Sequence, residues 1–450
     1  MAHDLSTGGI AAHIRRLAAP AAVGLFCQTL YNITDTFYAG YLGTEAQAAL
    51  SFSFPLYFVL LSCSVGLSQA LTARVAKSVG GRRSARGCCF ITQGALLAVF
   101  IGAIIWLVFL GLSLLRPALD LLGADGDARI MALEYIVIIF YAAPVYLLLF
   151  VFGGALQAAG DTKTYRNSVI GSALLNIVLD PMLMFGWFGL PALGVAGVAL
   201  STVISTALSA CYVVWVFSRT DLAKRWRLFF LRPHFAKLSG LLADALTPMA
   251  RMFAIGAGFF ITTGFLGVLD SSAVAAYGIA LRVEQLFLLP LIGMEMAMLA
   301  FAGQNFGAQK PARIKDAARI IARAGFSFTF AGALILILGG NLLMTAFNGE
   351  AEVINYGRYY LFVAAAAGPL YFVMNISGAV LLAGRRPRPI FAASIIRLLV
   401  LPPLLYWLFA MHLQMGVNGI WLGVWLAQIF PALWLGRQAH RLLVDEQNAR

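Results

Sequence analysis

Two carboxylates lie inside long apolar stretches of this 450-residue chain. Asp35 lies in the second half of the apolar run that opens the sequence, and Asp180 lies within a later run, after the residues LLNIVL. An ionisable side chain at the centre of a membrane helix costs at least about 2.5–3.5 kcal/mol, so such residues generally serve a function and face the protein interior or a wet cavity. Asp35 and Asp180 are therefore predicted to bind a proton or a small cation.

Two further polar side chains fall at a similar depth. Asn176 precedes Asp180 by one helical turn and shares its face, and Thr202 lies about eight residues into the next apolar segment. Asp35 and Asp180 each lie about seven residues, or roughly 10 Å, from the outer ends of their segments. Carboxylate, amide and hydroxyl oxygens suit Na⁺, and two nearby carboxylates favour retention of a proton by one of them. The four residues are predicted to form a proton or Na⁺ site, with interhelical hydrogen bonding as the alternative, above all for Thr202.

The composition indicates that these residues are surrounded by membrane. Hydrophobic residues make up 61% of the chain and charged residues only 11%, and the mean hydropathy is +0.85. The net charge of +13 is spread over short loops between apolar runs, which is typical of loops that face anionic lipid and argues against a nucleic-acid partner. The sequence therefore predicts an all-α, polytopic membrane protein.

Charges, turns and clusters of Gly and Pro divide the apolar runs into twelve segments. Most of these segments are long enough to cross about 30 Å of hydrocarbon. They cover residues 17–42, 46–75, 88–112, 131–157, 166–187, 194–217, 244–269, 273–303, 319–341, 353–383, 389–410 and 416–436.

Lysine and arginine are concentrated in alternate loops. The basic loops include residues 74–86, 219–237 and 310–323, whereas the opposite loops carry the acidic stretch 120–127 and Asp270. By the positive-inside rule, both termini are predicted to lie in the cytoplasm. We expect a multi-pass protein of the cytoplasmic (inner) membrane, with the first apolar run retained as an uncleaved anchor.

The two halves of the chain resemble each other. GLSQALTARVAKSVGGRRSAR from Gly66 aligns with GMEMAMLAFAGQNFGAQKPAR from Gly293, and GVAGVAL from Gly194 aligns with GVNGIWL from Gly416. The common order of the matches predicts two pseudo-symmetric six-helix bundles of the same orientation, a plan known from transporters. The predicted parts are an N-terminal lobe at 1–217, a cytoplasmic linker at 218–243, a C-terminal lobe at 244–436 and a cytoplasmic tail at 437–450.

The second half lacks the acidic pair but carries charges of its own. The positions equivalent to Asp35 and Asp180 fall near Thr262 and Thr263 and in LPPLL at 401–405, so ion coupling is predicted for the first half alone. The charged residues in the apolar segments of the second half are Arg251, Arg282, Glu284, Glu295 and Arg397. They are predicted to form a structural or gating charge network, with direct substrate contact as the alternative.

Other residues are candidates to line a substrate cavity. Methionine and aromatic side chains adapt to different ligands, and Tyr141, Met182, Met294 and Met298 are of this kind, although packing or lipid contact is the simpler explanation for each. The sequence contains no Gly-x-x-x-x-Gly-Lys loop, no His-Glu-x-x-His motif and no nucleophile elbow. We therefore expect no enzymatic activity and no cofactor, and an ion gradient of H⁺ or Na⁺ as the energy source for transport.

These features together resemble the multidrug and toxic compound extrusion (MATE) family. The matching stretches are Pro20 with Asp35, GYLGTEAQAAL from Gly40, ALQAAGDTKT from Ala155, LLNIVLDP from Leu174, and RVEQLFLLPLIG with AGQNFGAQKPAR in the second half. The resemblance covers nearly the whole chain. The pattern from Asn176 to Pro181 is similar to that of the DNA-damage-inducible-F-type branch. The norfloxacin-type branch uses acids in helices seven and ten. This chain has no acid in helix seven and has Asn375 in helix ten, which argues against that branch.

The resemblance implies a V-shaped antiporter that exports amphipathic, often cationic drugs by alternating access, driven by H⁺ or Na⁺. It implies cation binding by residues matching Asp35, Asn176, Asp180 and Thr202 and a conformational hinge at Pro20, with Pro181 as a second candidate hinge. The expected partners are small amphipathic substrates and membrane lipid, and the expected state is a monomer. Two rivals stay open: a flippase or exporter of a lipid-linked or amphipathic metabolite, and a membrane enzyme that acts on lipids.

Overall fold

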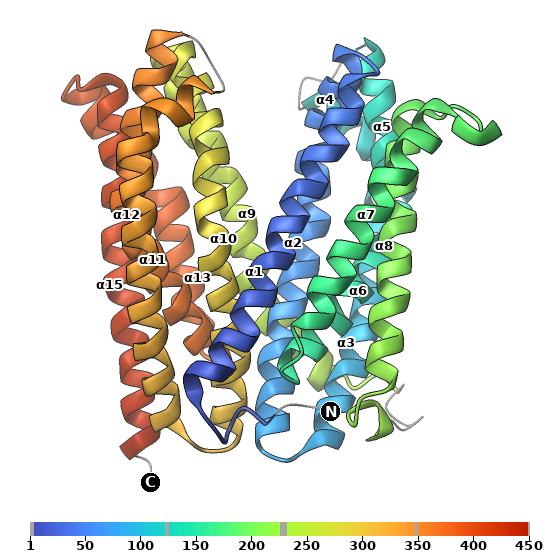
Figure 1. Ribbon diagram of the computed structural model, residues 1–450, viewed down its shortest axis with the longest axis vertical. Helices are drawn as coiled ribbons and strands as arrows, with labels where there is room; N and C mark the ends of the chain where they lie inside the picture. The colour runs from blue at the N-terminus through green and yellow to red at the C-terminus, as the bar shows by residue number, and fades with distance from the viewer. Residues whose placement is uncertain (1–3, 122–125, 226–231, 347–349, 449–450) are drawn as a thin grey trace. The chain divides into compact units, whose positions relative to one another are not determined.

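Helices make up almost the whole of the computed structural model (Figure 1). It describes residues 4–121, 126–225, 232–346 and 350–448, with side chains described at all of these positions except 30–37, 39, 40, 44, 47, 121 and 271. No β-strand occurs within these ranges. The all-α prediction is therefore confirmed.

The first half of the chain contains eight α-helices and three short segments of other helix types. They are α1 (Ile10–Gly40), α2 (Thr44–Gly80), α3 (Ser84–Ile105), the π-helical η1 (Trp106–Gly111), α4 (Leu115–Leu121), α5 (Gly126–Tyr141), α6 (Ala143–Ala158), α7 (Lys163–Phe185), η2 (Trp187–Gly189), α8 (Gly194–Ser218) and η3 (Ala223–Arg225). The second half contains α9 (Phe235–Leu269), α10 (Ser271–Gly307), α11 (Pro311–Thr345), α12 (Ala351–Ala383), α13 (Arg388–Ile395), the π-helical η5 (Ile396–Val400), α14 (Leu401–Tyr406), the π-helical η6 (Trp407–His412) and α15 (Gly416–Asn448).

Eleven helical stretches of the described chain are long and apolar enough to cross a membrane, and the bent pair α5–α6 makes a twelfth. Each of the twelve predicted segments coincides with one of them. Several helices are longer than predicted, because charged residues do not end a helix. α9 begins at Phe235, and α15 continues to Asn448 through most of the predicted tail.

The fourth predicted segment is broken in the middle. α5 and α6 meet at an angle of 50° around Ala142. Pro144 has no N–H to donate to Phe140 O, which would be its normal helical acceptor. Trp106 Nε1 donates to that carbonyl instead, at 2.7 Å, so the break leaves Phe140 O satisfied.

Contacts divide the chain into two compact units. Unit 1 comprises Met1–Asp4 and Val23–Met249, and unit 2 comprises Leu5–Ala22 and Ala250–Arg450, so α1 and α9 each contribute residues to both. Each unit has its own core of buried apolar side chains.

The helices of the two units have corresponding packing partners. In unit 1, α2 packs against α3 and α6, α6 packs against α3 and α8, and α7 packs against α8. In unit 2, α10 packs against α11 and α12, α12 packs against α11 and α15, and α14 packs against α15. The internal repeat seen in the sequence is thus a repeat of helix packing.

The repeat also extends to backbone conformation. After α2, Arg82 has a φ of 56° and Arg83 N–H donates to Ser78 O at 2.8 Å. After α10, Gln309 has a φ of 58° and Lys310 N–H donates to Asn305 O at 2.8 Å. A left-handed residue followed by a bond back into the helix is a common way to close a last turn. Arg82 and Gln309 are equivalent in the aligned sequences, so both halves end this helix in the same way.

Candidate functional site

A tight hairpin between α7 and α8 positions the predicted ion site in unit 1. α7 ends at Phe185, and Gly186 takes the left-handed conformation, with a φ of 76°. Leu193 N–H then donates to Leu183 O at 3.0 Å. Gly197 approaches so closely that a Cβ atom there would meet Leu183 O at 2.6 Å. The first turns of α8 are thereby held against the last turns of α7, where Asp180 lies.

Asp180 is the centre of a buried group of polar side chains. Asn176 Nδ2 donates to Asp180 Oδ1 at 3.0 Å and lies 3.1 Å from Ser201 Oγ, which itself hydrogen bonds to Asp180 Oδ1. Asn176, Asp180 and Ser201 are all 0% exposed. Burying a carboxylate is costly unless it is protonated or balanced by a cation. A proton or a cation held at this group would offset that cost.

Two oxygen atoms beside this group are buried and have no hydrogen-bond partner. They are Asn176 Oδ1 and Thr202 Oγ1, and Thr202 is only 4% exposed. Together with the Asp180 carboxylate they are oxygen donors of the kind that Na⁺ prefers, and they also suit water bound to a protonated carboxyl. No group of three or more His, Cys, Asp or Glu residues lies together in the described chain. A cation at Asp180 would therefore need neutral oxygens to complete its coordination, and Asn176 Oδ1 is such an oxygen within the group.

Sequence reasoning selected Thr202 and missed Ser201. The two residues lie at almost the same depth, but Ser201 contacts Asp180 while the Thr202 hydroxyl makes no hydrogen bond. Successive residues of a helix point about 100° apart, so counting depth along the chain cannot choose between them. The signal that was present is the series Ser201, Ser205 and Ser209, which marks one polar face of α8.

The second half of α1 reaches the same part of unit 1. Pro181 has no N–H, so Ile177 O lacks its helical donor, and Tyr38 Oη donates to it at 3.4 Å. Tyr38 follows Asp35 by three residues, and the Asp35 side chain itself lies outside the described residues.

The two candidate hinges lie within continuous helices. Pro20 is buried in α1, which runs unbroken from Ile10 to Gly40, and Pro181 is buried in α7. In both helices the chain continues past the proline without a break.

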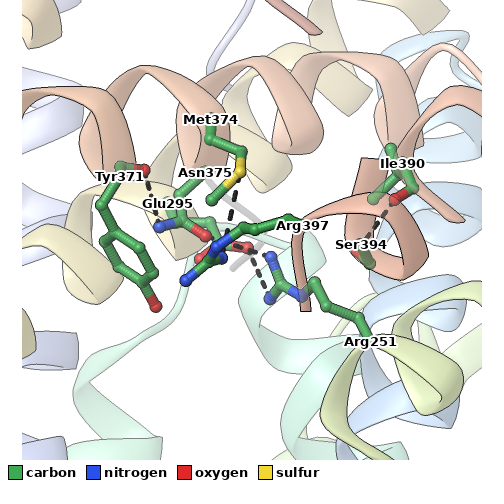
Figure 2. Close-up of polar contacts among 8 residues, drawn as sticks. All are labelled: Arg251, Glu295, Tyr371, Met374, Asn375, Ile390, Ser394 and Arg397. Carbon is green, nitrogen blue, oxygen red and sulfur yellow. Dashed lines mark hydrogen bonds and ion pairs between the residues drawn. The ribbon is translucent and has the colours of Figure 1, made fainter. Parts of the chain in front are cut away.

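A second polar cluster lies in unit 2, where α9, α10 and α12 meet (Figure 2). Arg251 Nη2 forms an ion pair with Glu295 Oε1 at 3.0 Å, and Arg251 Nη1 donates to Asn375 Oδ1 at 3.1 Å. Asn375 Nδ2 donates in turn to Tyr371 O at 2.9 Å. Arg251 and Glu295 are 17% and 11% exposed at their side chains, so this pair is largely withdrawn from solvent.

Arg397 lies beside this pair without a carboxylate partner of its own (Figure 2). Its guanidinium lies 5.2 Å from the Tyr371 ring and donates to Met374 Sδ at 3.9 Å, and its Nε has no partner. No ion pair joins Arg397 to any carboxylate of the described chain. A half-buried guanidinium that contacts an aromatic face and a thioether has unused hydrogen-bonding capacity for an anion.

The local backbone explains how Arg397 is presented. It lies in the π-helical segment η5, and Pro402 and Pro403 follow directly in α14. Neither proline can donate to the carbonyl four residues earlier, so regular α-helical bonding is lost before them. Single π-helical turns of this kind often occur at functional sites.

The five charged residues predicted as one network are placed in different ways. Glu284 accepts a hydrogen bond from Tyr360 Oη at 2.7 Å, away from the Arg251–Glu295 pair, although it is close enough to Arg397 for an electrostatic interaction. Arg282 is exposed on α10. Only Arg251, Glu295 and Arg397 are therefore brought together, and Tyr371, Met374 and Tyr360 are partners that the sequence pattern did not reveal.

The position equivalent to Asp35 holds a hydroxyl group in unit 2, and the position equivalent to Asp180 falls in the apolar stretch LPPLL at 401–405. Thr262 Oγ1 of α9 lies 3.0 Å from Tyr406 Oη of α14, and both residues are buried. The contact joins the helices that correspond to α1 and α7, but it contains no ionisable carboxylate.

The residues considered for a substrate cavity differ in exposure. Tyr141 is 63% exposed, whereas Met298 is 0% exposed and Met182 and Met294 are half-buried. Their role in a substrate cavity stays a prediction.

The fold and the buried polar clusters define a polytopic helical membrane protein with a different polar centre in each of its two units. The MatE family model matches residues 20–182 and 248–407, and the chain belongs to this family.

Several relatives in this family carry transporter names. The chain is 28% identical over 410 residues to the FAD transporter of Shewanella oneidensis, covering 89% of this chain and 88% of that protein. It is 24% identical over 421 residues to the probable multidrug resistance protein NorM of Thermotoga maritima, covering 91% and 88%. The structure of a MOP-superfamily transporter from Pyrococcus furiosus matches with a TM-score of 0.91 at 21% identity, over 99% of this chain and 98% of that one. The family and the fold predicted from the sequence are thus confirmed.

Proposed function

We propose that this protein is a secondary antiporter that exports amphipathic small molecules in exchange for H⁺ or Na⁺. The observation that carries the proposal is the fully buried Asp180 with its neutral partners Asn176 and Ser201 in unit 1. A carboxylate in this setting takes up a cation when its own charge is unfavourable and releases it when the site is opened to water. The chain has no phosphate-binding loop, so an ion gradient is the remaining energy source.

The proposed cycle is alternating access in the cytoplasmic membrane, with both termini in the cytoplasm and the monomer as the working unit. In the outward-open state the ion reaches Asp180 from outside. Ion and substrate binding exclude each other, so ion uptake releases the exported molecule. Return to the inward-open state delivers the ion to the cytoplasm.

The test uses purified protein in liposomes and a fluorescent amphipathic cation. Gradients of pH and of Na⁺ are imposed separately, and wild type is compared with Asp180→Asn and with Asp221→Asn, which changes an exposed loop carboxylate. We expect one of the two gradients to drive exchange in wild type and in Asp221→Asn, and neither gradient to do so in Asp180→Asn. Full gradient-driven exchange by Asp180→Asn would refute the proposal.

A second candidate function is export of an amphipathic anion, and Arg397 is the observation that favours it. Its guanidinium has no carboxylate partner in the described chain and lies against the ring of Tyr371. Such a pair suits a planar molecule that carries a phosphate or carboxylate. The similarity to a protein named FAD transporter points to the same class of substrate.

The two candidates are separated by competition in the same liposomes. FAD and a fluorescent amphipathic cation are each tested in two ways. Each is first the transported solute, and each is then added as a competitor of the other's transport. Exchange of FAD, together with inhibition by micromolar FAD, would favour the anion exporter. Exchange of the cation without any exchange of FAD would exclude it.

A further inference from the structure

A line of polar side chains extends from Asp180 along the facing sides of α7 and α8. On each helix the members recur every four residues, which is about one turn, so each series lies on one face. We call this set the α7–α8 polar line; it consists of Ser168, Ser172, Asn176 and Asp180 on α7 and of Ser201, Ser205 and Ser209 on α8.

The two series face each other along the length of the hairpin. The helices pack side by side (Figure 1). At one end Ser201 hydrogen bonds to Asp180, and at the other end Ser209 Oγ donates to Ser168 O at 3.0 Å. The twelve positions between Ser168 and Asp180 correspond to roughly 18 Å of helix. The line therefore connects the buried carboxylate with the end of unit 1 at which α7 begins.

A cavity of about 290 Å³ lies along the half of this line away from Asp180. Six of its nine lining residues carry a hydroxyl or amide group, namely Asn167, Ser168, Ser172, Ser205, Ser209 and Tyr212. One water takes up about 30 Å³ in the liquid, so the space holds several. Apolar atoms make up most of the lining surface, and the hydroxyl and amide groups supply hydrogen-bond partners for water within it.

Ser205 shows that interhelical packing alone does not explain the serines. Packed membrane helices commonly satisfy a serine hydroxyl with a backbone carbonyl, as Ser201 does with Val198 O and Ser209 does with Ser168 O. Ser205 lines the cavity and is 0% exposed, yet its hydroxyl has no partner. Buried hydroxyl groups without a protein partner are normally satisfied by ordered water.

We propose that the α7–α8 polar line is a hydrated path through which a proton bound at Asp180 leaves toward the end of unit 1 where α7 begins. The charge pattern of the loops predicts that this end faces the cytoplasm. The inference rests on the proposed ion coupling at Asp180 and specifies the route that the coupling ion takes. Ser205 is not a direct partner of Asp180, so ion coupling at Asp180 alone assigns it no role in transport. The path does assign it one.

The transfer conserves atoms and charge at every step. The O–H bond of the Asp180 carboxyl breaks as a new O–H bond forms on an adjacent water, and the carboxylate keeps the electron pair. Each later hop forms one O–H bond on the next water or serine hydroxyl and breaks one on the previous carrier. One proton reaches bulk water, and Asp180 is left ionised.

Hydration is tested by thiol labelling, which is independent of transport. The five native cysteines, Cys27, Cys63, Cys88, Cys89 and Cys211, are first replaced by alanine. Ser205→Cys is then compared with Leu174→Cys, which lies at a similar level of α7 but is 62% exposed on another face. A small, charged methanethiosulfonate reagent requires an ionised thiol, and a thiol ionises only in contact with water. We expect Ser205→Cys to react at least about tenfold faster than Leu174→Cys, and equal or slower reaction would overturn the path.

Transport provides the second test. Ser205→Leu fills the line with an apolar side chain, whereas Ser205→Thr keeps a hydroxyl. We expect pH-driven exchange to fall at least about tenfold in Ser205→Leu and to stay within about twofold of wild type in Ser205→Thr. Ser205→Val, which also places apolar bulk in the line and has nearly the shape of threonine, gives the same comparison if the leucine variant does not fold.

The outcomes separate this inference from the proposed function. Loss of exchange in Asp180→Asn with full pH-driven exchange in Ser205→Leu would refute the path and leave ion coupling intact. Full exchange in Asp180→Asn would refute ion coupling itself, and exchange driven by Na⁺ alone would refute a proton path. The labelling result decides in every case whether water reaches Ser205.

Discussion

In unit 1, α7 and α8 enclose one buried carboxylate, Asp180, whose described partners are the neutral side chains of Asn176 and Ser201. In unit 2, the helices equivalent to α1 and α7 bring together two hydroxyl groups, those of Thr262 and Tyr406. The helix contacts of the two units correspond, while their polar chemistry does not. An internal repeat therefore preserves which helices pack together and leaves each unit free to specialise.

The charges of unit 2 emphasise the difference. Arg251 is neutralised by Glu295, but Arg397 beside them has no carboxylate partner in the described chain. Unit 1 thus presents a site suited to a cation, and unit 2 presents a guanidinium suited to an anion. The proposed ion coupling and the second candidate function, export of an anion, thus rest on residues of different units.

Two prolines at similar positions show that the units also differ in backbone conformation. Pro144 and Pro369 occupy similar positions in the two halves, yet α5 and α6 bend by 50° at Pro144 while α12 continues through Pro369. In unit 1 the carbonyl freed by the proline receives a hydrogen bond from Trp106. The surroundings of a proline, and not the proline alone, decide whether a helix breaks there.

The largest effect is expected from Asp180→Asn set against Thr262→Val. Gradient-driven exchange should fall to the level of empty liposomes in Asp180→Asn, because its side chain can no longer bind a proton or balance a cation. Thr262→Val, which removes one of the two hydroxyl groups that meet between the equivalent helices of unit 2, should stay within about twofold of wild type. Thermal unfolding in detergent serves as the folding control, and Asp180→Asn should be at least as stable as wild type because it removes a buried charge. Loss of exchange in both variants would contradict the assignment of ion coupling to unit 1 alone.

A large loss of stability is expected from Glu295→Gln. Removing one partner of a buried ion pair leaves an uncompensated charge, at a cost of about 3–5 kcal/mol. Thermal unfolding should therefore shift to a clearly lower temperature. The double variant Arg251→Met with Glu295→Gln should recover most of the loss, because it removes the stranded guanidinium as well. Unfolding of Glu295→Gln at the wild-type temperature would show that the pair contributes little.

A moderate change in substrate preference is expected from Arg397→Gln. Hydrogen bonds to charged groups contribute about 1.5–3 kcal/mol, so inhibition by an amphipathic anion such as FAD should weaken by at least about tenfold. Inhibition by an amphipathic cation should be unchanged. Arg282→Gln is the matched control, because it removes an arginine that is exposed on α10. Equal effects of the two substitutions would argue against a specific role for Arg397.

The smallest effect is expected from Trp106→Phe. This change removes the hydrogen bond to Phe140 O at the α5–α6 break while keeping an aromatic ring, at a cost of about 1 kcal/mol. Trp187→Phe, which alters a half-exposed tryptophan of the same unit, should change stability by less. Chemical unfolding followed by circular dichroism measures both. A larger loss in Trp187→Phe would contradict the role assigned to Trp106.

Part of the candidate site was accessible from sequence. A carboxylate in an apolar run is a strong signal, and helical periodicity placed Asn176 on the face of Asp180. Ser201 was missed because depth along a helix does not specify rotation about its axis, and that rotation is fixed by the close contact of Gly197 with Leu183. In unit 2, five charges in apolar segments were predicted to form one network, but only Arg251, Glu295 and Arg397 lie together.

The amino-acid sequence by itself determined the repeat and the helices that are long and apolar enough to span a membrane, because hydrophobicity and periodicity act locally along the chain. Only the tertiary structure decided which side chains meet: Ser201 with Asp180, Asn375 with Arg251, and Tyr371 with Arg397. Those encounters depend on how neighbouring helices rotate and how closely they approach. That is settled by packing between residues far apart in the sequence, which no local pattern records.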